Sequence, residues 1–183
     1  MRQRLTRLAH EILARHLGPG DLVVDATAGN GHDTLFLALR VSPGGHVFAF
    51  DLQKQALENT RERLAQAGSL CKLTLLQYGH ERMSEKLPAE ARGRLAAVMF
   101  NLGYLPGGDK QLTTSPSTTL AALQQSLELL APGAILSVLA YRQHPGGQEE
   151  CEAVRQALNK TQGFRLEIHD SPGPVLFLAH KDG

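Results

Sequence analysis

The sequence predicts an α/β fold in which a mostly parallel sheet is covered by helices on both faces. Segments with helical periodicity alternate along the chain with short apolar segments of high β propensity. The last two short segments are joined by Asp170-Ser171-Pro172-Gly173-Pro174. Because this connection is too short for a helical crossover, the two segments must form an antiparallel hairpin.

Local patterns define each element. In the first segment Leu5, Leu8, Ile12 and Leu13 repeat at helical spacing, and Gly18-Pro19-Gly20 stops the helix. Ser115 and Pro116 suit the N-cap and first position of a later helix. The expected strands are Leu22–Asp25, His46–Phe50, Cys71–Leu76, Leu95–Phe100, Ala134–Ala140, Phe164–His169 and Val175–Ala179. The other expected helices are Asp33–Arg40, Gln53–Ala67, Glu81–Leu87, Pro116 to about Leu130, and Gln148–Thr161.

Length and composition predict one domain over residues 1–183, with residues 1–17 as an additional N-terminal helix. The net charge of +1 excludes a general basic field for nucleic acid. Cys71 and Cys151 match neither a metal-binding spacing nor a disulfide framework, so we expect free buried thiols and no metal. With no membrane-spanning run and no signal-peptide pattern, we expect a cytoplasmic protein without membrane contact.

The stretch from Leu22 to Thr34, LVVDATAGNGHDT, is typical of a cofactor site. A strand ending in Asp25 runs into a turn with Gly29 and Gly31, and a helix follows. The glycines let a ligand approach the backbone, and the helix start presents free N–H groups. A plain tight turn, with Asp25 bonded to loop amides, is the alternative interpretation.

Two acids narrow the choice of cofactor. Asp51 ends the second strand, about 20 residues beyond the glycines, where an acid accepts hydrogen bonds from ribose hydroxyls. Thr34 stands where a dinucleotide site usually has a third glycine, and the carboxylate of Asp33 would repel a pyrophosphate. The same carboxylate suits the sulfonium and ammonium groups of S-adenosylmethionine (SAM), which we therefore favour over NAD(P).

These residues resemble the class I SAM-dependent methyltransferases, from about Leu22 to the end of the chain. The resemblance implies a doubly wound, Rossmann-like sheet of seven strands in the order 3-2-1-4-5-7-6, with an antiparallel C-terminal hairpin. The residues of this sequence that match the cofactor site of that family are Asp25, Gly29, Gly31 and Asp51. Gly79-His80 stands where many members have an acid that contacts the adenine amine.

Asn101-Leu102-Gly103-Tyr104 follows the fourth strand and resembles the N-P-P-Y motif of amine methyltransferases, with both prolines replaced. An amine nucleophile must direct its lone pair at the methyl group while its N–H groups are held. The Asn101 oxygen can accept such a proton, and Tyr104 can stack on a flat base. The alternative interpretation of this motif is that Asn101 caps a turn and Tyr104 is a half-buried aromatic residue.

Four blocks together, DATAGNGHDT, FDLQ, NLGYLPGGDK and YRQHPGGQEE, resemble a group of small single-domain bacterial rRNA methylases. Members of that group methylate the 5-aminomethyl group of wobble 2-thiouridine in tRNA. The resemblance implies a SAM site that also includes Asn30, His32, Leu52, Gln53, Gly79 and His80. It implies a target-base site of Asn101, Tyr104, Gly107, Gly108, Asp109 and Lys110, with Tyr141, His144, Gly146 and Gly147 on the opposite lip.

The amine must lose a proton before it can attack, and His144 and Asp33 are the candidate acceptors. The alternative for His144 is a loop residue that fixes the turn before Pro145. Alternatives to the tRNA enzyme are an rRNA base methyltransferase, a small-molecule amine methyltransferase, an NAD(P)-binding protein and a non-catalytic SAM-binding module.

RNA contact has only weak support in the sequence. One basic cluster lies in the first helix (Arg2, Arg4, Arg7, Arg15) and another follows the third strand (Arg82, Lys86, Arg92, Arg94). Each can meet phosphates, and each also suits an ordinary solvated surface. A homodimer would enlarge the RNA-binding surface, a possibility the sequence leaves open.

Overall fold

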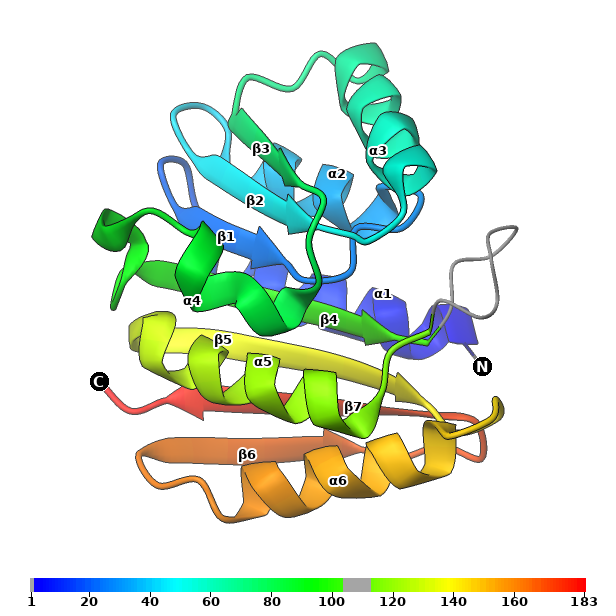
Figure 1. The fold of residues 1–183 in the computed structure, drawn as a ribbon. Coiled ribbons are helices and arrows are strands. Elements are labelled where there is room, and N and C mark those ends of the chain that lie inside the picture. Colours follow the sequence, from blue (N-terminus) through cyan, green and yellow to red (C-terminus); the bar gives the residue numbers. More distant parts are fainter. Residues whose placement is uncertain (1, 104–112) are drawn as a thin grey trace.

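The computed structural model describes residues 2–103 and 113–183 and contains a single seven-stranded sheet among them (Figure 1). The strand order is β3-β2-β1-β4-β5-β7-β6, which confirms the order implied by the methyltransferase resemblance. The strands are β1 (Leu22–Asp25), β2 (His46–Phe50), β3 (Lys72–Leu76), β4 (Leu95–Leu102), β5 (Leu130–Tyr141), β6 (Phe164–His169) and β7 (Pro174–Lys181).

The five strands β3, β2, β1, β4 and β5 pair in parallel, and β7 pairs antiparallel with both β5 and β6. The predicted hairpin of the last two strands is therefore confirmed. Since β6 consequently runs parallel to β5, the turn after β6 lies at the edge where the parallel strands end. That edge is where open α/β sheets bind ligands.

Helices cover both faces of the sheet. α1 (Arg2–Ala14), α2 (His32–Val41) and α3 (Lys54–Gln66) pack on one face. α4 (Met83–Lys86), α5 (Pro116–Leu129) and α6 (Gly147–Asn159) pack on the other, with short 3₁₀ turns η1 (His80–Arg82) and η2 (Ala89–Ala91) beside them. In Figure 1 α5 and α6 lie in front of the sheet, whereas α1 and α2 lie behind it.

Alternating strand residues build two cores. Val23, Val47 and Ala97 face α1 and α2, whereas their neighbours Val24 and Phe48 face the opposite layer. This follows from the two-residue period of a strand, and it explains why the central strands are apolar on both sides. Leu37 of α2 and Leu13 of α1 are fully buried in the first core.

Most predicted boundaries agree with the structure within a few residues, and the largest difference is at the start of β5. β4 continues through Asn101 to Leu102, so Asn101 belongs to the strand and does not follow it. β5 begins at Leu130, directly after α5, and not at Ala134. The predicted helix Glu81–Leu87 is a 3₁₀ turn followed by one turn of α-helix. No helix in the described ranges has the length and apolar character needed to cross a bilayer.

Candidate active site

A cavity of about 740 Å³ opens at the edge of the sheet where the parallel strands end. Its walls come from the segments that follow β1, β2 and β3, from the ends of β4 and β5, and from the β6–β7 turn. Of the residues predicted for the site, those that line it are Gly29, Asn30, His32, Asp33, Asp51, Leu52, Gln53, Gly79, His80, Asn101, Tyr141 and His144. The predicted residues Tyr104, Gly107, Gly108, Asp109 and Lys110 lie outside the described residues.

The glycine loop is held between the neighbouring strands. The Ala26 N–H donates to Met99 O of β4 at 2.8 Å, and the Ala28 N–H donates to Phe50 O of β2 at 2.9 Å. Gly29 adopts a left-handed conformation (φ 53°), and its N–H donates to Asp51 Oδ2 at 2.9 Å. The loop is therefore tied to the acid that ends β2.

Gly31 does not line the cavity. It precedes α2 with a left-handed φ of 77°, and a Cβ there would lie 2.7 Å from the Thr60 Cα of α3. The glycine is needed because α2 and α3 approach so closely at this point. Its role is in the packing beneath the loop.

Asp25 also lies beneath the cavity and is almost completely buried. Thr34 donates to its Oδ2 at 2.6 Å, and the Thr27 N–H donates to its Oδ1 at 3.1 Å. Burial raises the pKa of Asp25 to about 7, with a further contribution from the negative charge of Asp33. Asp25 therefore supports the loop by accepting a hydrogen bond from a loop amide. This is the alternative interpretation of Asp25, as a residue that stabilises the turn.

Asp51 and Leu52 form the cofactor side of the cavity. Asp51 Oδ1 accepts the Gln53 N–H at 2.8 Å, which fixes the carboxylate at the cavity wall. Leu52 is 54% exposed, an apolar side chain that a flat ring can cover. Asn30 is held from α3, where Asn59 donates to its Oδ1 at 3.0 Å and Arg63 to its carbonyl at 2.7 Å.

His80 is a buried residue of the cavity wall. Its Nδ1 lies 3.2 Å from the Ala26 carbonyl, so Nδ1 carries the hydrogen, and its ring meets Phe100 edge-on at 5.5 Å. Burial lowers the pKa of His80, which keeps the imidazole neutral. His80 therefore contacts the Ala26 carbonyl and Phe100 from within the cavity wall.

Asp33 and Asn101 meet at the cavity wall. Asn101 Nδ2 donates to Asp33 Oδ2 at 3.1 Å, and the Asn101 N–H donates to Thr27 Oγ1 at 2.7 Å. The other carboxylate oxygen, Oδ1, lies 2.7 Å from His10 Nε2 of α1. Sequence reasoning selected Asp33 and Asn101, but it missed Thr27 and His10.

The far side of the cavity is formed by Tyr141, Gln143, His144 and the turn Pro172-Gly173-Pro174. Gly146 and Gly147 do not line it. Gly146 caps the start of α6 with φ 79°, and Gly147 packs closely against the Tyr141 carbonyl and the His144 ring. These two glycines therefore support the residues on the far side of the cavity without lining it.

Glu150 of α6 is a buried carboxylate that sequence reasoning missed. It accepts hydrogen bonds of 2.7 Å from Thr114 and Thr119. Thr114 Oγ1 in turn accepts the Gly103 N–H at 3.0 Å. Glu150 thus anchors two cavity-lining residues, Gly103 at the end of β4 and Thr114 before α5.

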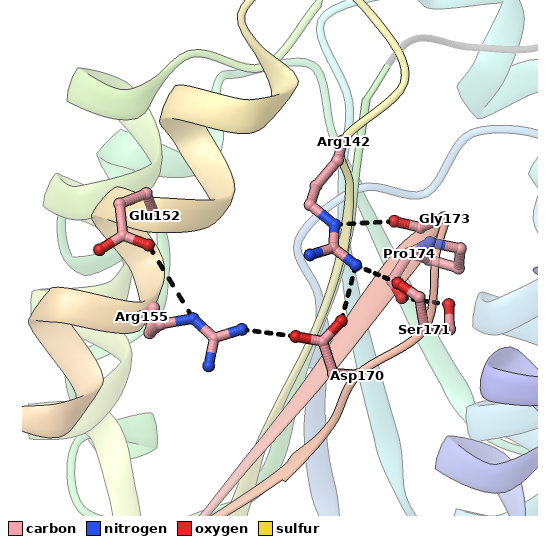
Figure 2. Close-up of polar contacts among 7 residues, drawn as sticks. All are labelled: Arg142, Glu152, Arg155, Asp170, Ser171, Gly173 and Pro174. Atoms are coloured by element: carbon pink, nitrogen blue, oxygen red, sulfur yellow. Dashed lines mark hydrogen bonds and ion pairs between the residues drawn. The ribbon is translucent and has the colours of Figure 1, made fainter.

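Figure 2 shows how the β6–β7 turn is held. Arg142, at the end of β5, donates to the carbonyls of Gly173 and Ser171 and pairs with Asp170 at 2.6 Å. Arg155 of α6 reaches the same carboxylate at 2.9 Å. The signal for this wall was available in the sequence, since a hairpin turn that follows a strand parallel to β5 must lie at the carboxyl edge.

The charged residues that line the cavity are acidic. Asp33, Asp51 and Glu81 are among them, and no described lining residue is lysine or arginine. A pyrophosphate would find no basic partner on the described walls, whereas a cationic ligand would find two carboxylates beside the glycine loop. The site therefore suits a ligand that carries positive charge.

Comparison with known proteins agrees with this geometry. A family model described as "Putative rRNA methylase" matches residues 47–170. The chloroplastic tRNA (mnm5s2U34)-methyltransferase of Arabidopsis thaliana is 44% identical over 161 residues, 84% of this chain. The chain spans 58% of that relative's length.

Two solved structures cover the chain almost completely. One, from Clostridium thermocellum, is titled as an rRNA methylase and is 37% identical, with a TM-score of 0.89 and 96% of each chain covered. The other, a methyltransferase from Streptococcus mutans in complex with SAH, is 32% identical, with a TM-score of 0.82 and coverage of 96% of this chain and 97% of that one. With the family model and these full-length neighbours in agreement, the chain belongs to the rRNA methylase family of methyltransferases.

Proposed function

We propose that this protein is a SAM-dependent N-methyltransferase that acts on the 5-aminomethyl group of wobble 2-thiouridine in tRNA. The position of Asn101 carries the proposal. It lies at the end of β4, between the glycine loop on one side of the cavity and Tyr141 and His144 on the other. An amide at that point can hold an amine beside a cofactor bound over the glycine loop.

The relatives support both the cofactor and the substrate. The Arabidopsis relative is named for the methylation of the wobble nucleoside, and the Streptococcus structure contains SAH, the demethylated form of SAM. The cavity fits SAM, because Asp51 is placed for ribose hydroxyls, Leu52 for the adenine face, and Asp33 for the cationic end. When bound, SAM supplies an electrophilic methyl group on its sulfonium.

The chain's own residues prepare the amine. Asn101 Oδ1 accepts one of its N–H groups and so directs the nitrogen lone pair away from itself. His144 lines the cavity together with Tyr141 and Gln143, on the side where we place the substrate. Its Nδ1 lies 3.0 Å from the Pro145 carbonyl, and an imidazole is a common proton acceptor in active sites. We assign the removal of the ammonium proton to His144, because we assign the other candidate, Asp33, to the cationic end of SAM.

RNA phosphates would be met outside the acidic cavity. Arg82 and Lys86 lie over the ring of Tyr78, 4.8 and 4.1 Å from its centroid, and Tyr78 is a residue of the cavity wall. We propose this basic pair as a phosphate contact beside the entrance. The cytoplasmic location and a homodimer stay predictions.

The test is methylation of tRNA that carries 5-aminomethyl-2-thiouridine, with isotope-labelled SAM and mass spectrometry of the released nucleosides. We expect label in 5-methylaminomethyl-2-thiouridine. Asn101→Ala should lower kcat by roughly 100-fold or more, as the loss of an aligning hydrogen bond does in other active sites. Asn159→Ala, an exposed asparagine on α6, is the matched control and should keep full activity.

Ribosomal RNA and free alkylamines are included as competing substrates. Label in ribosomal RNA alone, or equal activity on free amines without RNA, would contradict the tRNA proposal. Calorimetric titration with SAH and NAD separates the cofactors. Tight binding of NAD without binding of SAH would overturn the assignment of SAM.

A further inference from the structure

We propose that His10 is a positioning residue for methyl transfer, which acts through Asp33 to hold the Asn101 amide with its oxygen toward the amine. The inference rests on the proposed function and deepens it. It gives a role in the reaction to α1, the helix that the sequence suggests is an addition to the methyltransferase core. α1 lies behind the sheet in Figure 1, on the same face as α2.

The contacts determine the orientation of the amide. Asp33 Oδ1 lies 2.7 Å from His10 Nε2, and Asp33 Oδ2 accepts from Asn101 Nδ2 at 3.1 Å. An ionised carboxylate can only accept, so both partners must be donors. The Asn101 nitrogen therefore faces Asp33, and Oδ1 is the amide atom left for a ligand.

The Asn101 backbone is fixed separately. Its N–H donates to Thr27 Oγ1 at 2.7 Å, and its neighbours in β4 pair with β1 and β5. The remaining freedom is rotation of the side chain, and the Asp33 carboxylate restricts that rotation. If Asp33 moved, the Asn101 amide would be free to rotate by half a turn. Its N–H group would then face the N–H of the substrate amine, which would hold the amine away from the methyl group.

The surroundings of His10 suit a residue that positions Asp33 and does not contact a ligand. Its ring stacks on Phe36 of α2 with 3.9 Å between centroids and 4° between planes, which fixes the direction of Nε2. His10 does not line the cavity, whereas Asp33 and Asn101 both do. The side chain of Asp33 is only 8% exposed, so His10 takes up a carboxylate oxygen that solvent could reach only poorly.

The experiment compares His10→Ala and His10→Gln, with His16→Ala as the control. His16 is an exposed histidine just beyond the end of the same helix. We expect His10→Ala to lower single-turnover methyl transfer by about tenfold to 100-fold. The KM for tRNA should stay unchanged, since His10 does not line the cavity. Glutamine can donate from a similar position and should restore much of the rate.

A double-variant cycle separates positioning from a merely structural role. If His10 acts through Asn101, adding His10→Ala to Asn101→Ala causes no further loss, whereas a general loss of structure would be additive. Thermal unfolding confirms that the compared variants are folded. Wild-type rates in His10→Ala, or additivity in the cycle, would overturn the inference while Asn101→Ala still reports on the proposed function. Full activity in Asn101→Ala would instead refute the proposed function.

Discussion

At the scale of one residue, the folded structure disfavours the ionised form of Asp25. Its carboxyl is buried at the end of β1, and Asp33 and Asp51 lie near enough to raise its pKa further, to about 7. Thr34 and the Thr27 amide offset part of this cost by donating to it. A buried acid beneath a cofactor loop therefore makes the loop sensitive to pH.

Stability should fall as pH rises from about 4 to about 7. In this window Asp25 binds a proton in the folded state, where its pKa is about 7, and none in the unfolded state, where it is near 3.8. Unfolding then releases a proton, so the free energy of unfolding decreases with pH, by at most about 4 kcal/mol in total.

Asp25→Asn should flatten that dependence, because an asparagine cannot ionise. Urea denaturation of wild type and variant at several pH values measures the two slopes. Glu62→Gln, on the exposed side of α3, is the control and should keep the wild-type slope. Parallel curves for wild type and Asp25→Asn would contradict the assignment.

At the level of elements, the β6–β7 turn shows how a connection becomes a wall of the site. Pro172 and Gly173 line the cavity, and Arg142 and Arg155 tie Asp170 and its neighbours to β5 and α6 (Figure 2). Three of the contacts come from Arg142 alone. The wall should therefore depend on this one side chain.

Arg142→Gln should weaken substrate binding more than cofactor binding. The variant loses its charge-assisted bonds to the turn, and we expect a loss of about 1–3 kcal/mol in unfolding free energy. The KM for tRNA should rise about tenfold, which corresponds to ~1.4 kcal/mol, with SAH affinity unchanged. Arg165→Gln, with a side chain 66% exposed on β6, is the control. An unchanged KM for Arg142→Gln would show that this wall does not meet the substrate.

The elements themselves were predictable wherever the local signal was strong. Ser115 caps α5 by accepting the Thr118 N–H, with Pro116 at the first position, as its sequence indicates. The fourth strand was predicted to end at Phe100, but asparagine has a low β propensity and pairing with Leu139 of β5 nevertheless extends β4 through Asn101. Pairing with a neighbour can outweigh propensity at a strand end.

At the scale of the whole molecule, α1 is part of the core and not an attachment to it. Leu13 is fully buried in a core cluster that includes residues of α2, β1, β5 and β7, and Ala9 belongs to the same cluster. Leu13→Ala should lower the free energy of unfolding by about 2–5 kcal/mol, as large-to-small core changes do. Chemical denaturation measures this loss, and Leu39→Ala, at an exposed position of α2, provides the control. A loss below about 1 kcal/mol would contradict the packing of α1, because a leucine-to-alanine change in a protein core costs about 2 kcal/mol or more.

The sequence by itself determined the alternation of strands and helices, the antiparallel hairpin, and the positions of the glycine loop, Asp51 and Asn101. These follow from periodicity, turn residues and chain direction, which act over a few residues. The tertiary structure decided which side chains meet: His10 with Asp33 across 23 residues, Asn101 with Asp33 across 68, and Arg142 with Asp170 across 28. Such contacts depend on the angle and depth at which α1, α2 and β6 pack on the sheet. The glycine loop predicted where a cofactor binds, but only packing could show that His10, on a helix behind the sheet, reaches Asp33 and through it Asn101.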